Sequence, residues 1–299
     1  MIEEAWNEYR GWAKRARSLQ RSTRQWNRAA LVCGGLVAIF GAAASQVPDG
    51  LLFGKAMAFM AAVLAAITPV LGREILSVGG EAQWIRARAT AEAIKSECFR
   101  FAAQLGDYAG SSAKDVFVAR RNALTEPAER AGLTPLHDPV PTTGDARRPP
   151  IPLTVPWYME NRVGEQVQYY ARGQKENEEA VARLRMIGFG SAVIAAVLGV
   201  AASNFGQERF ASWIGVMTTI AATITAYGLL DRRQYLAATY GAMATQLSRI
   251  SEVFSNGTVN FSALVNTAED LLQGEHAAWT ERMTQSIAAS RKAAENEAK

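Results

Sequence analysis

The chain reads MIGFGSAVIAAVLGVAAS at residues 186–203 and FASWIGVMTTIAATITAYGLL at residues 210–230, and these two stretches decide the fold. Neither stretch contains a charged side chain, and each is close to the roughly twenty residues that an α-helix needs to cross a bilayer. Only a short link separates them. The pair therefore predicts two membrane-spanning helices joined as a hairpin.

The same arrangement occurs earlier in the chain, where apolar stretches cover residues 29–47 and 51–72. The first span of each pair also ends in a similar run, GAAAS at 41–45 and GVAAS at 199–203. Internal repeats of this kind suggest duplication of one structural unit. The sequence predicts an all-α protein with four transmembrane helices arranged as two hairpins.

Basic residues predict the orientation of the spans. The segment before the first span, residues 1–28, carries seven Lys and Arg residues, whereas the links within the hairpins carry at most one each. The positive-inside bias therefore places both termini and the central segment in the cytoplasm. A cleavable signal peptide is the alternative interpretation of residues 1–46. The long basic region and the second span that follows almost at once argue against it.

Each hairpin is followed by apolar or small residues at alternating spacings of four and three, which indicates one face of a helix. We expect both hairpins to extend into a cytosolic helical bundle, whose helices are either ordinary amphipathic helices or a short supercoil. The positions are Ala87, Ala91, Ile94, Cys98, Phe101 and Leu105 after the first hairpin, and Leu236, Tyr240, Met243, Leu247, Ile250 and Phe254 after the second. The last forty residues predict one further helix, with apolar positions at Leu264, Leu271, Leu272 and Trp279.

A double glycine, Gly79 and Gly80, lies between the second span and the helix that follows it. It is a candidate hinge, and the alternative is a helix cap or bend required by packing. The fourth span is followed by Asp231-Arg232-Arg233, without glycine, so we expect a more continuous helix there.

Eight of the ten prolines lie in residues 106–156, which predicts a proline-rich cytosolic linker with a short helix at about 114–131. From Trp157 onward the pattern becomes helical again, with a charged face expected to be solvated. Its members are Glu160, Arg162, Glu165, Lys175, Glu176, Glu178 and Glu179. The chain accordingly divides into a first unit (1–110), a linker (111–156) and a second unit (157–299).

The sequence holds no pattern typical of an enzyme. The two histidines, His137 and His276, do not stand in metal-ligand spacing with other side chains, and no phosphate-binding loop or nucleophile elbow occurs. A net charge of +4 is too weak and too dispersed to indicate nucleic-acid binding. We expect no catalytic activity, no cofactor, no metal and no nucleic-acid partner.

Hydroxyl groups follow one side of the fourth span at Ser212, Thr219, Thr223 and Tyr227. This stripe is a candidate pore lining in an oligomer, and the alternative is that the hydroxyls bond their own backbone or a neighbouring helix. Glycines in the spans predict close helix packing, within one chain or between chains. They are Gly34, Gly35, Gly41, Gly188, Gly190 and Gly199.

The segment from Trp84 to Lys95, WIRARATAEAIK, directly follows the first hairpin. It resembles the aromatic-Arg-Ala-Ala-Glu-Lys signature of SLATT domains, the two-transmembrane effector domains associated with bacterial SMODS nucleotidyltransferases and SLOG sensors. The residues that carry this likeness are Trp84, Arg86, Arg88, Glu92 and Lys95. The second half resembles another SLATT type through Glu160, Asn161, Arg162, Val163, Gln166, Tyr169 and Tyr170 before its hairpin, and Glu269, Glu275 and Trp279 in its closing helix. The chain thus looks like a tandem of two SLATT-type units, although the second lacks the Arg-Ala-Ala-Glu-Lys element after its hairpin.

The resemblance implies a membrane effector of a bacterial anti-phage or conflict system in the inner membrane. Such an effector is expected to form a homo-oligomer and to perturb or permeabilise the lipid bilayer on the signal of a cytosolic nucleotide-signalling or sensor protein. The alternative function is a non-conducting membrane scaffold that recruits a cytosolic partner. The resemblance supplies no catalytic residues.

Overall fold

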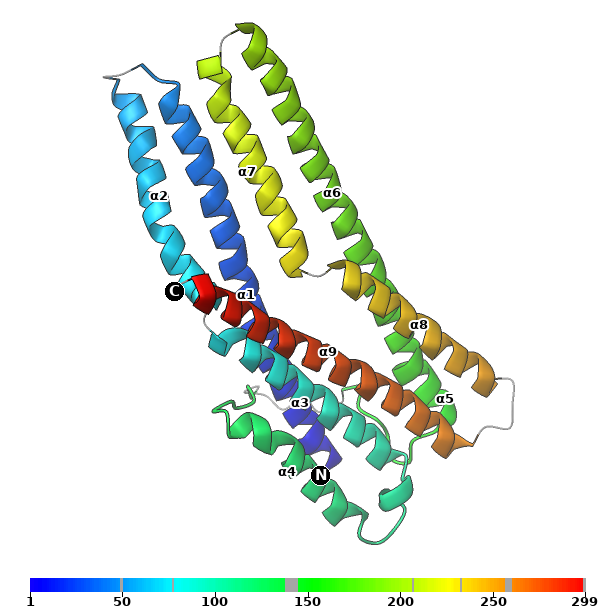
Figure 1. The fold of residues 1–299 in the computed structure, drawn as a ribbon. Helices are drawn as coiled ribbons and strands as arrows, with labels where there is room; N and C mark the ends of the chain where they lie inside the picture. Colours follow the sequence, from blue (N-terminus) through cyan, green and yellow to red (C-terminus); the bar gives the residue numbers. More distant parts are fainter. Residues whose placement is uncertain are drawn as a thin grey trace. The chain divides into compact units, whose positions relative to one another are not determined.

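The computed structural model describes residues 1–48, 51–76, 78–137, 145–205, 207–231, 233–255 and 260–297. Over these ranges the chain forms helices and no strands, which confirms the predicted all-α class. The first half contributes α1 (Ile2–Ser45), α2 (Leu52–Leu76), α3 (Val78–Ala102), the 3₁₀ turn η1 (Gly106–Tyr108) and α4 (Ala113–Glu129). The second half contributes α5 (Val155–Tyr158), the π-helix η2 (Met159–Gly164), α6 (Glu165–Phe205), α7 (Gln207–Asp231), α8 (Arg233–Ser255) and α9 (Phe261–Glu297) (Figure 1).

Long apolar helices mark this chain as a membrane protein. Among the described residues, Ile2–Ser45, Leu52–Leu71 and Val155–Asn204 are long and apolar enough to cross a bilayer. At most 11% of their apolar windows is buried inside the structure, so these surfaces require a nonaqueous environment. Side chains of the fourth stretch are described only over Phe210–Ile224 of α7, so the four-span arrangement stays a prediction.

The chain forms two compact units, and each unit draws on both halves of the sequence. The apolar-helix unit comprises Arg24–Leu76 and Arg172–Tyr240. The bundle unit comprises Met1–Thr23, Ser77–Ala171 and Gly241–Lys299. Each compact unit thus combines segments from both sides of the linker at 111–156. The division into 1–110, 111–156 and 157–299 stays a prediction.

Few of the described side chains of the apolar-helix unit are buried. They are Ala42, Leu71, Ser191, Ala202, Val216, Ala237 and Tyr240. One polar contact joins the two hairpins inside this unit, because the Ser45 hydroxyl donates a hydrogen bond to the Ser212 hydroxyl at 2.8 Å. Within the described part of the chain, a Cβ built at any of the six span glycines would meet no atom beyond the adjacent backbone of its own helix within 4 Å. The prediction of close helix contacts at these glycines is therefore wrong within one chain.

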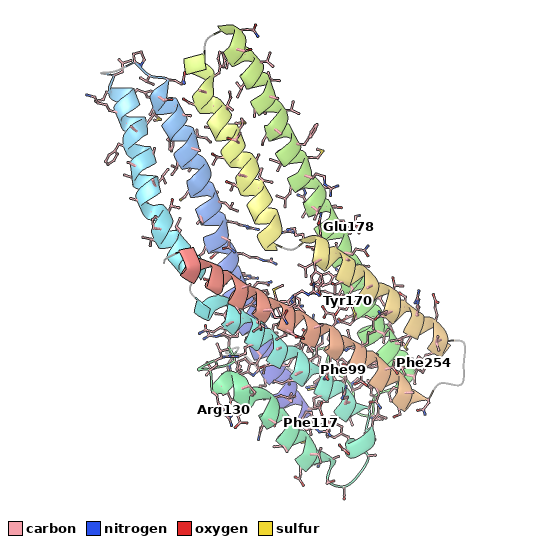
Figure 2. The ribbon with its side chains drawn as sticks, in the orientation of Figure 1. Phe99, Phe117, Arg130, Tyr170, Glu178 and Phe254 are labelled. Atoms are coloured by element: carbon pink, nitrogen blue, oxygen red, sulfur yellow. The ribbon has the colours of Figure 1, made fainter. Side chains whose placement is uncertain are left out.

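The bundle unit has a well-filled core. The predicted heptad face of α3 is buried at Ala87, Ala91, Ile94, Cys98 and Phe101, as that spacing requires. On α9, the expected positions Leu264, Leu272 and Trp279 are also buried, and α3 packs along α9. Phe99 and Phe117, both labelled in Figure 2, belong to the same core.

The proline-rich linker contains a helix that packs into the bundle core. The predicted helix at about 114–131 is confirmed as α4, in which Phe117 lies 4.5 Å from Phe101 between ring centroids. Farther along, the Leu136 amide donates to the Gly11 carbonyl at 3.2 Å, and the Leu153 amide donates to the Ala102 carbonyl at 3.1 Å. The described parts of the linker are therefore anchored to the bundle.

Candidate functional site

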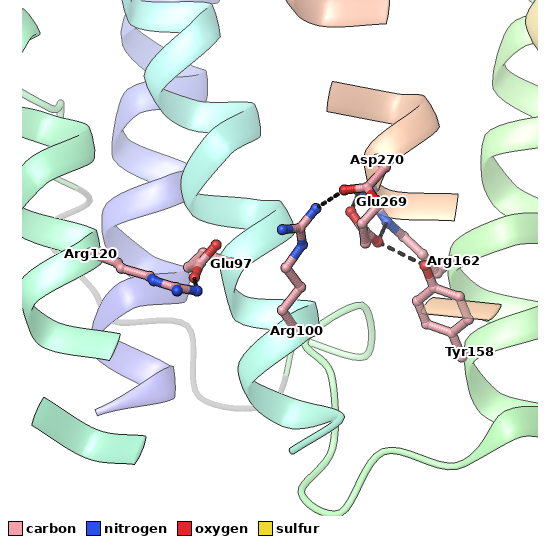
Figure 3. Close-up of polar contacts among 7 residues, drawn as sticks. All are labelled: Glu97, Arg100, Arg120, Tyr158, Arg162, Glu269 and Asp270. Atoms are coloured by element: carbon pink, nitrogen blue, oxygen red, sulfur yellow. Dashed lines mark hydrogen bonds and ion pairs between the residues drawn. The ribbon is translucent and has the colours of Figure 1, made fainter. Parts of the chain in front are cut away.

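A buried ion pair between the π-helix and α9 lies at the centre of the bundle unit. Arg162 Nε and Nη2 donate to the two carboxylate oxygens of Glu269, each at 2.8 Å, and the Tyr158 hydroxyl donates to Glu269 Oε1 at 2.9 Å (Figure 3). The side chains of Arg162 and Glu269 are 3% and 0% exposed. This burial corrects the expectation that Arg162 belongs to a solvated face. The physical reason is its partner, which lies 107 residues away and cannot be seen in local spacing.

The electrostatics of the pair keep both partners charged. Burial by itself would raise the pKa of Glu269, but the adjacent Arg162 guanidinium outweighs it and holds that pKa below its ordinary value. Burial would likewise lower the pKa of Arg162, and the Glu269 carboxylate raises it instead. The guanidinium also lies over the Phe99 ring, 4.6 Å from its centroid, so an aromatic face covers the charge.

A second polar group joins α3 to α6 and α9 around His276. Its Nε2 lies 3.6 Å from Glu92 Oε2 on α3, and its Nδ1 lies 3.1 Å from Glu275 Oε2. The Tyr170 hydroxyl donates to the same Glu275 oxygen at 3.2 Å. Burial alone would raise the pKa of Glu92, but the Lys95 ammonium and His276 lower it below its ordinary range. The imidazole thus lies between carboxylates from both halves of the chain.

An aromatic clamp extends this contact between the halves. The Trp84 and Trp279 rings meet edge to face with centroids 5.2 Å apart. The Arg88 guanidinium lies over the Trp279 ring at 4.4 Å. Of the motif residues that carried the family resemblance, the structure brings Trp84, Arg88 and Glu92 to the closing helix, whereas Arg86 is exposed.

Further ion pairs flank the centre. Arg100 on α3 contacts Asp270 on α9 at 2.6 Å. On the other side of α3, Glu97 accepts a hydrogen bond from Arg120 at 3.3 Å (Figure 3). It also accepts one from the Tyr108 hydroxyl. Together with the two groups above, these contacts form what we call the buried polar network, whose peripheral members Arg120 and Asp270 are 44% and 70% exposed. Its members are Trp84, Arg88, Glu92, Lys95, Glu97, Arg100, Arg120, Tyr158, Arg162, Tyr170, Glu269, Asp270, Glu275, His276 and Trp279.

Sequence reasoning missed the role of His276 and Tyr158 in this network. A usable signal exists on α9, where Glu269, Leu272, Glu275 and Trp279 recur at spacings of three and four. Carboxylates in line with buried apolar positions must find partners inside the core, since an unpaired buried charge is costly. The pattern therefore marks α9 as a helix with a charged, buried face.

The candidate pore lining lies in the apolar-helix unit. Ser212 bonds Ser45, Thr219 is exposed and Thr223 is half-buried, while the side chain of Tyr227 lies outside the described residues. A pore-lining role for these positions stays a prediction.

The backbone at Gly79 and Gly80 is helical, within the first turn of α3. Ser77 and Arg232, which decide whether the neighbouring helices are continuous, lie outside the described residues. The hinge and the continuous fourth span are therefore both untested.

The polar groups of the network are paired with one another across helices. Within the described ranges, no three His, Cys, Asp or Glu side chains gather in a way that could hold a metal ion. The carboxylates of the network are instead paired with guanidinium, imidazole and phenol groups. Such pairing holds α3, α6 and α9 together.

These features define the class: a helical membrane protein whose bundle is held together by a buried polar network. Residues 158–279 match the family model described as SMODS and SLOG-associating 2TM effector domain 1, SLATT_1. Residues 158–279, within the second half of the chain, are therefore similar to SLATT domains. Residues 4–115 match a different model, DUF4231, a protein family of unknown function. No curated protein and no solved structure was found to be similar.

The first and last residues of the SLATT match both belong to the buried polar network. The matched segment begins at Tyr158 and ends at Trp279, so it contains the Arg162–Glu269 pair as well as α6 and α7. The likeness of the second half is thereby confirmed. The first half matches another model, and a second SLATT copy there stays a prediction.

Proposed function

We propose that this protein is a membrane effector of a bacterial conflict system, which oligomerises and perturbs or permeabilises the inner membrane on a partner's signal. The observation that carries the proposal is the match of residues 158–279 to the SLATT_1 family, which is described as an effector domain with two transmembrane segments. The long apolar helices are consistent with action at the bilayer.

Two features of the apolar-helix unit support an oligomeric membrane-active form. Its apolar side chains are largely exposed, with Phe189 at 72% and Val197 at 63% on α6. Its span glycines have open space around them, so close helix approach between chains is sterically free. The bundle unit would receive the signal, because its network joins helices from both halves.

The test is membrane potential in bacteria that express the full chain together with its chromosomal neighbours, followed with a dye during phage infection. Val197→Asp places a charge in the middle of the α6 apolar segment, where it is poorly tolerated, and Val197→Leu is the matched control. We expect depolarisation with the wild type and with Val197→Leu, and none with Val197→Asp.

A wild-type protein that reaches the membrane but leaves the potential unchanged during infection would refute the effector function. The non-conducting scaffold would then be the better description. In that case affinity purification should recover a soluble partner from the same cells.

A further inference from the structure

Each half of the chain places an arginine as the last charged residue before a long apolar run. Arg28 precedes the run at 29–47, and Arg185 precedes the run at 186–203. Both belong to the apolar-helix unit, and both are exposed. Within the part of the chain that the structure describes, neither guanidinium has a carboxylate at ion-pair distance. Arg183, two residues away, does reach one, Glu179 at 3.9 Å.

Arg185 lies on the most exposed apolar face of α6. The side chains that follow it at helical spacing are Phe189, Val193, Val197 and Val200, which are 72%, 44%, 63% and 65% exposed. Steps of four, four, four and three keep these positions on one side of the helix. A lipid whose acyl chain packs on this face would therefore have its headgroup beside the guanidinium.

Arg28 likewise lies at the end of an exposed apolar face on α1. Val32 follows it by four residues and Ile39 by eleven, so the three share one face, and these two apolar side chains are 61% and 38% exposed. Arg24, also exposed, lies one turn before Arg28, about 6 Å along the axis at 1.5 Å per residue. The first helix thus offers two guanidinium groups at the end of its apolar face.

We propose that Arg28 and Arg185 bind the phosphodiester headgroups of acidic phospholipids, whose acyl chains pack on the apolar face that each arginine terminates. A guanidinium fork matches two phosphate oxygens and remains charged at any physiological pH. A zwitterionic headgroup presents its own ammonium to this cation, whereas phosphatidylglycerol carries net negative charge. Charge complementarity therefore selects the acidic lipid. The proposal is independent of whether the protein permeabilises the membrane.

The experiment uses the purified full chain in vesicles that contain trace spin-labelled phosphatidylglycerol or phosphatidylcholine. Electron paramagnetic resonance measures the fraction of each lipid that the protein immobilises. The wild type should prefer phosphatidylglycerol, by about fivefold at each arginine, given that a basic residue near the surface contributes about 1 kcal/mol. The double variant Arg28→Gln/Arg185→Gln should lower this ratio severalfold, and Arg24 on α1 accounts for the preference that remains.

Arg183→Gln is the matched control, because it removes a nearby exposed arginine that already has a carboxylate partner, and it should keep the wild-type ratio. Arg28→Lys/Arg185→Lys should retain part of the preference, since the charge stays and the fork is lost. The wild-type preference should also weaken in about 0.5 M salt because exposed charges are screened.

Equal immobilisation of the two lipids by the wild type would overturn the proposal. So would a double Gln variant with an unchanged ratio, or a preference that salt does not affect. If the Gln variant fails to enter vesicles, the wild-type ratio, the Lys variant and the salt series still decide the outcome.

Discussion

Replacing Arg162 by glutamine should strongly destabilise the bundle unit. The change leaves the Glu269 carboxylate, which is 0% exposed, with the Tyr158 hydroxyl but without its counter-charge. Removing one partner of a buried ion pair typically costs about 3–5 kcal/mol, because the remaining charge is desolvated and uncompensated. In a unit of this size each kcal/mol lowers the melting temperature by about 2–4 °C, so we expect a decrease of roughly 6–20 °C.

The assay is thermal unfolding of the purified full chain in mild detergent, followed by intrinsic tryptophan fluorescence. The matched control is Arg130→Gln, because Arg130 contacts Glu126 at 2.5 Å in an i,i+4 pair whose side chains are 75% and 56% exposed. Exposed pairs of this kind contribute about 0.3–0.5 kcal/mol, which corresponds to a decrease of about 2 °C or less.

A double variant separates the charge from the packing. Arg162→Met combined with Glu269→Leu removes both charges at similar volume, and such replacements of buried pairs are often neutral. The Tyr158 hydroxyl then lacks its acceptor, which should cost about 1–3 kcal/mol. We therefore expect the double variant to be more stable than Arg162→Gln. The reasoning is refuted if Arg162→Gln melts within about 2 °C of Arg130→Gln, or if the double variant is the least stable of the three.

Three further changes test other parts of the structure by the same melting assay. Because the pKa of Glu92 is lowered in the folded protein, its contribution to stability is present above the ordinary pKa of 4.5 and is lost as the pH falls below that value. Glu92→Gln should therefore flatten the acid dependence of the melting temperature. An unchanged pH profile in this variant would contradict the prediction. Trp279→Ala removes a side chain that is 3% exposed and should cost about 3–5 kcal/mol, so a wild-type melting temperature would argue against the aromatic clamp. Gly173→Ala would place a methyl group against the Tyr240 ring and should cost about 1–3 kcal/mol. Gly274 has open space around it, so Gly274→Ala should be neutral or stabilise the protein by up to about 1 kcal/mol. Equal effects of the two changes would count against the close contact between Gly173 and Tyr240.

The sequence predicts the helices and their buried faces well because both follow from local spacing. The alternation of four and three on α3 marks positions such as Ile94 and Cys98, which are 1% and 0% exposed. The closing helix is likewise confirmed, with Leu264 fully buried. Composition alone also identifies the apolar runs, since their length and lack of charge need no tertiary information.

The candidate site was only partly predictable, because its residues are paired over long distances in sequence. Trp84 and Trp279 could be marked by family resemblance, but their contact joins the first half to the end of the second. Arg162 looks like a member of a charged, solvated face until Glu269 is placed beside it. A pattern of charges along one helix cannot distinguish a water-facing side chain from one whose counter-ion arrives from another helix.

Apolar spacing alone does not determine which helix packs against α9, and the buried polar network supplies the missing specificity. Both α3 and α8 carry heptad-like apolar faces, so hydrophobic burial alone does not discriminate between them. The face of α3 adds Glu92 beside its apolar positions, whereas the corresponding face of α8 offers Met243 and Leu247. His276 on α9 meets Glu92 on α3 as well as Glu275 on its own helix. Pairing α9 with α8 in place of α3 would therefore remove the Glu92 partner of a buried polar group. The charges therefore specify which helices of the two halves meet, and the apolar contacts stabilise the arrangement once it is chosen.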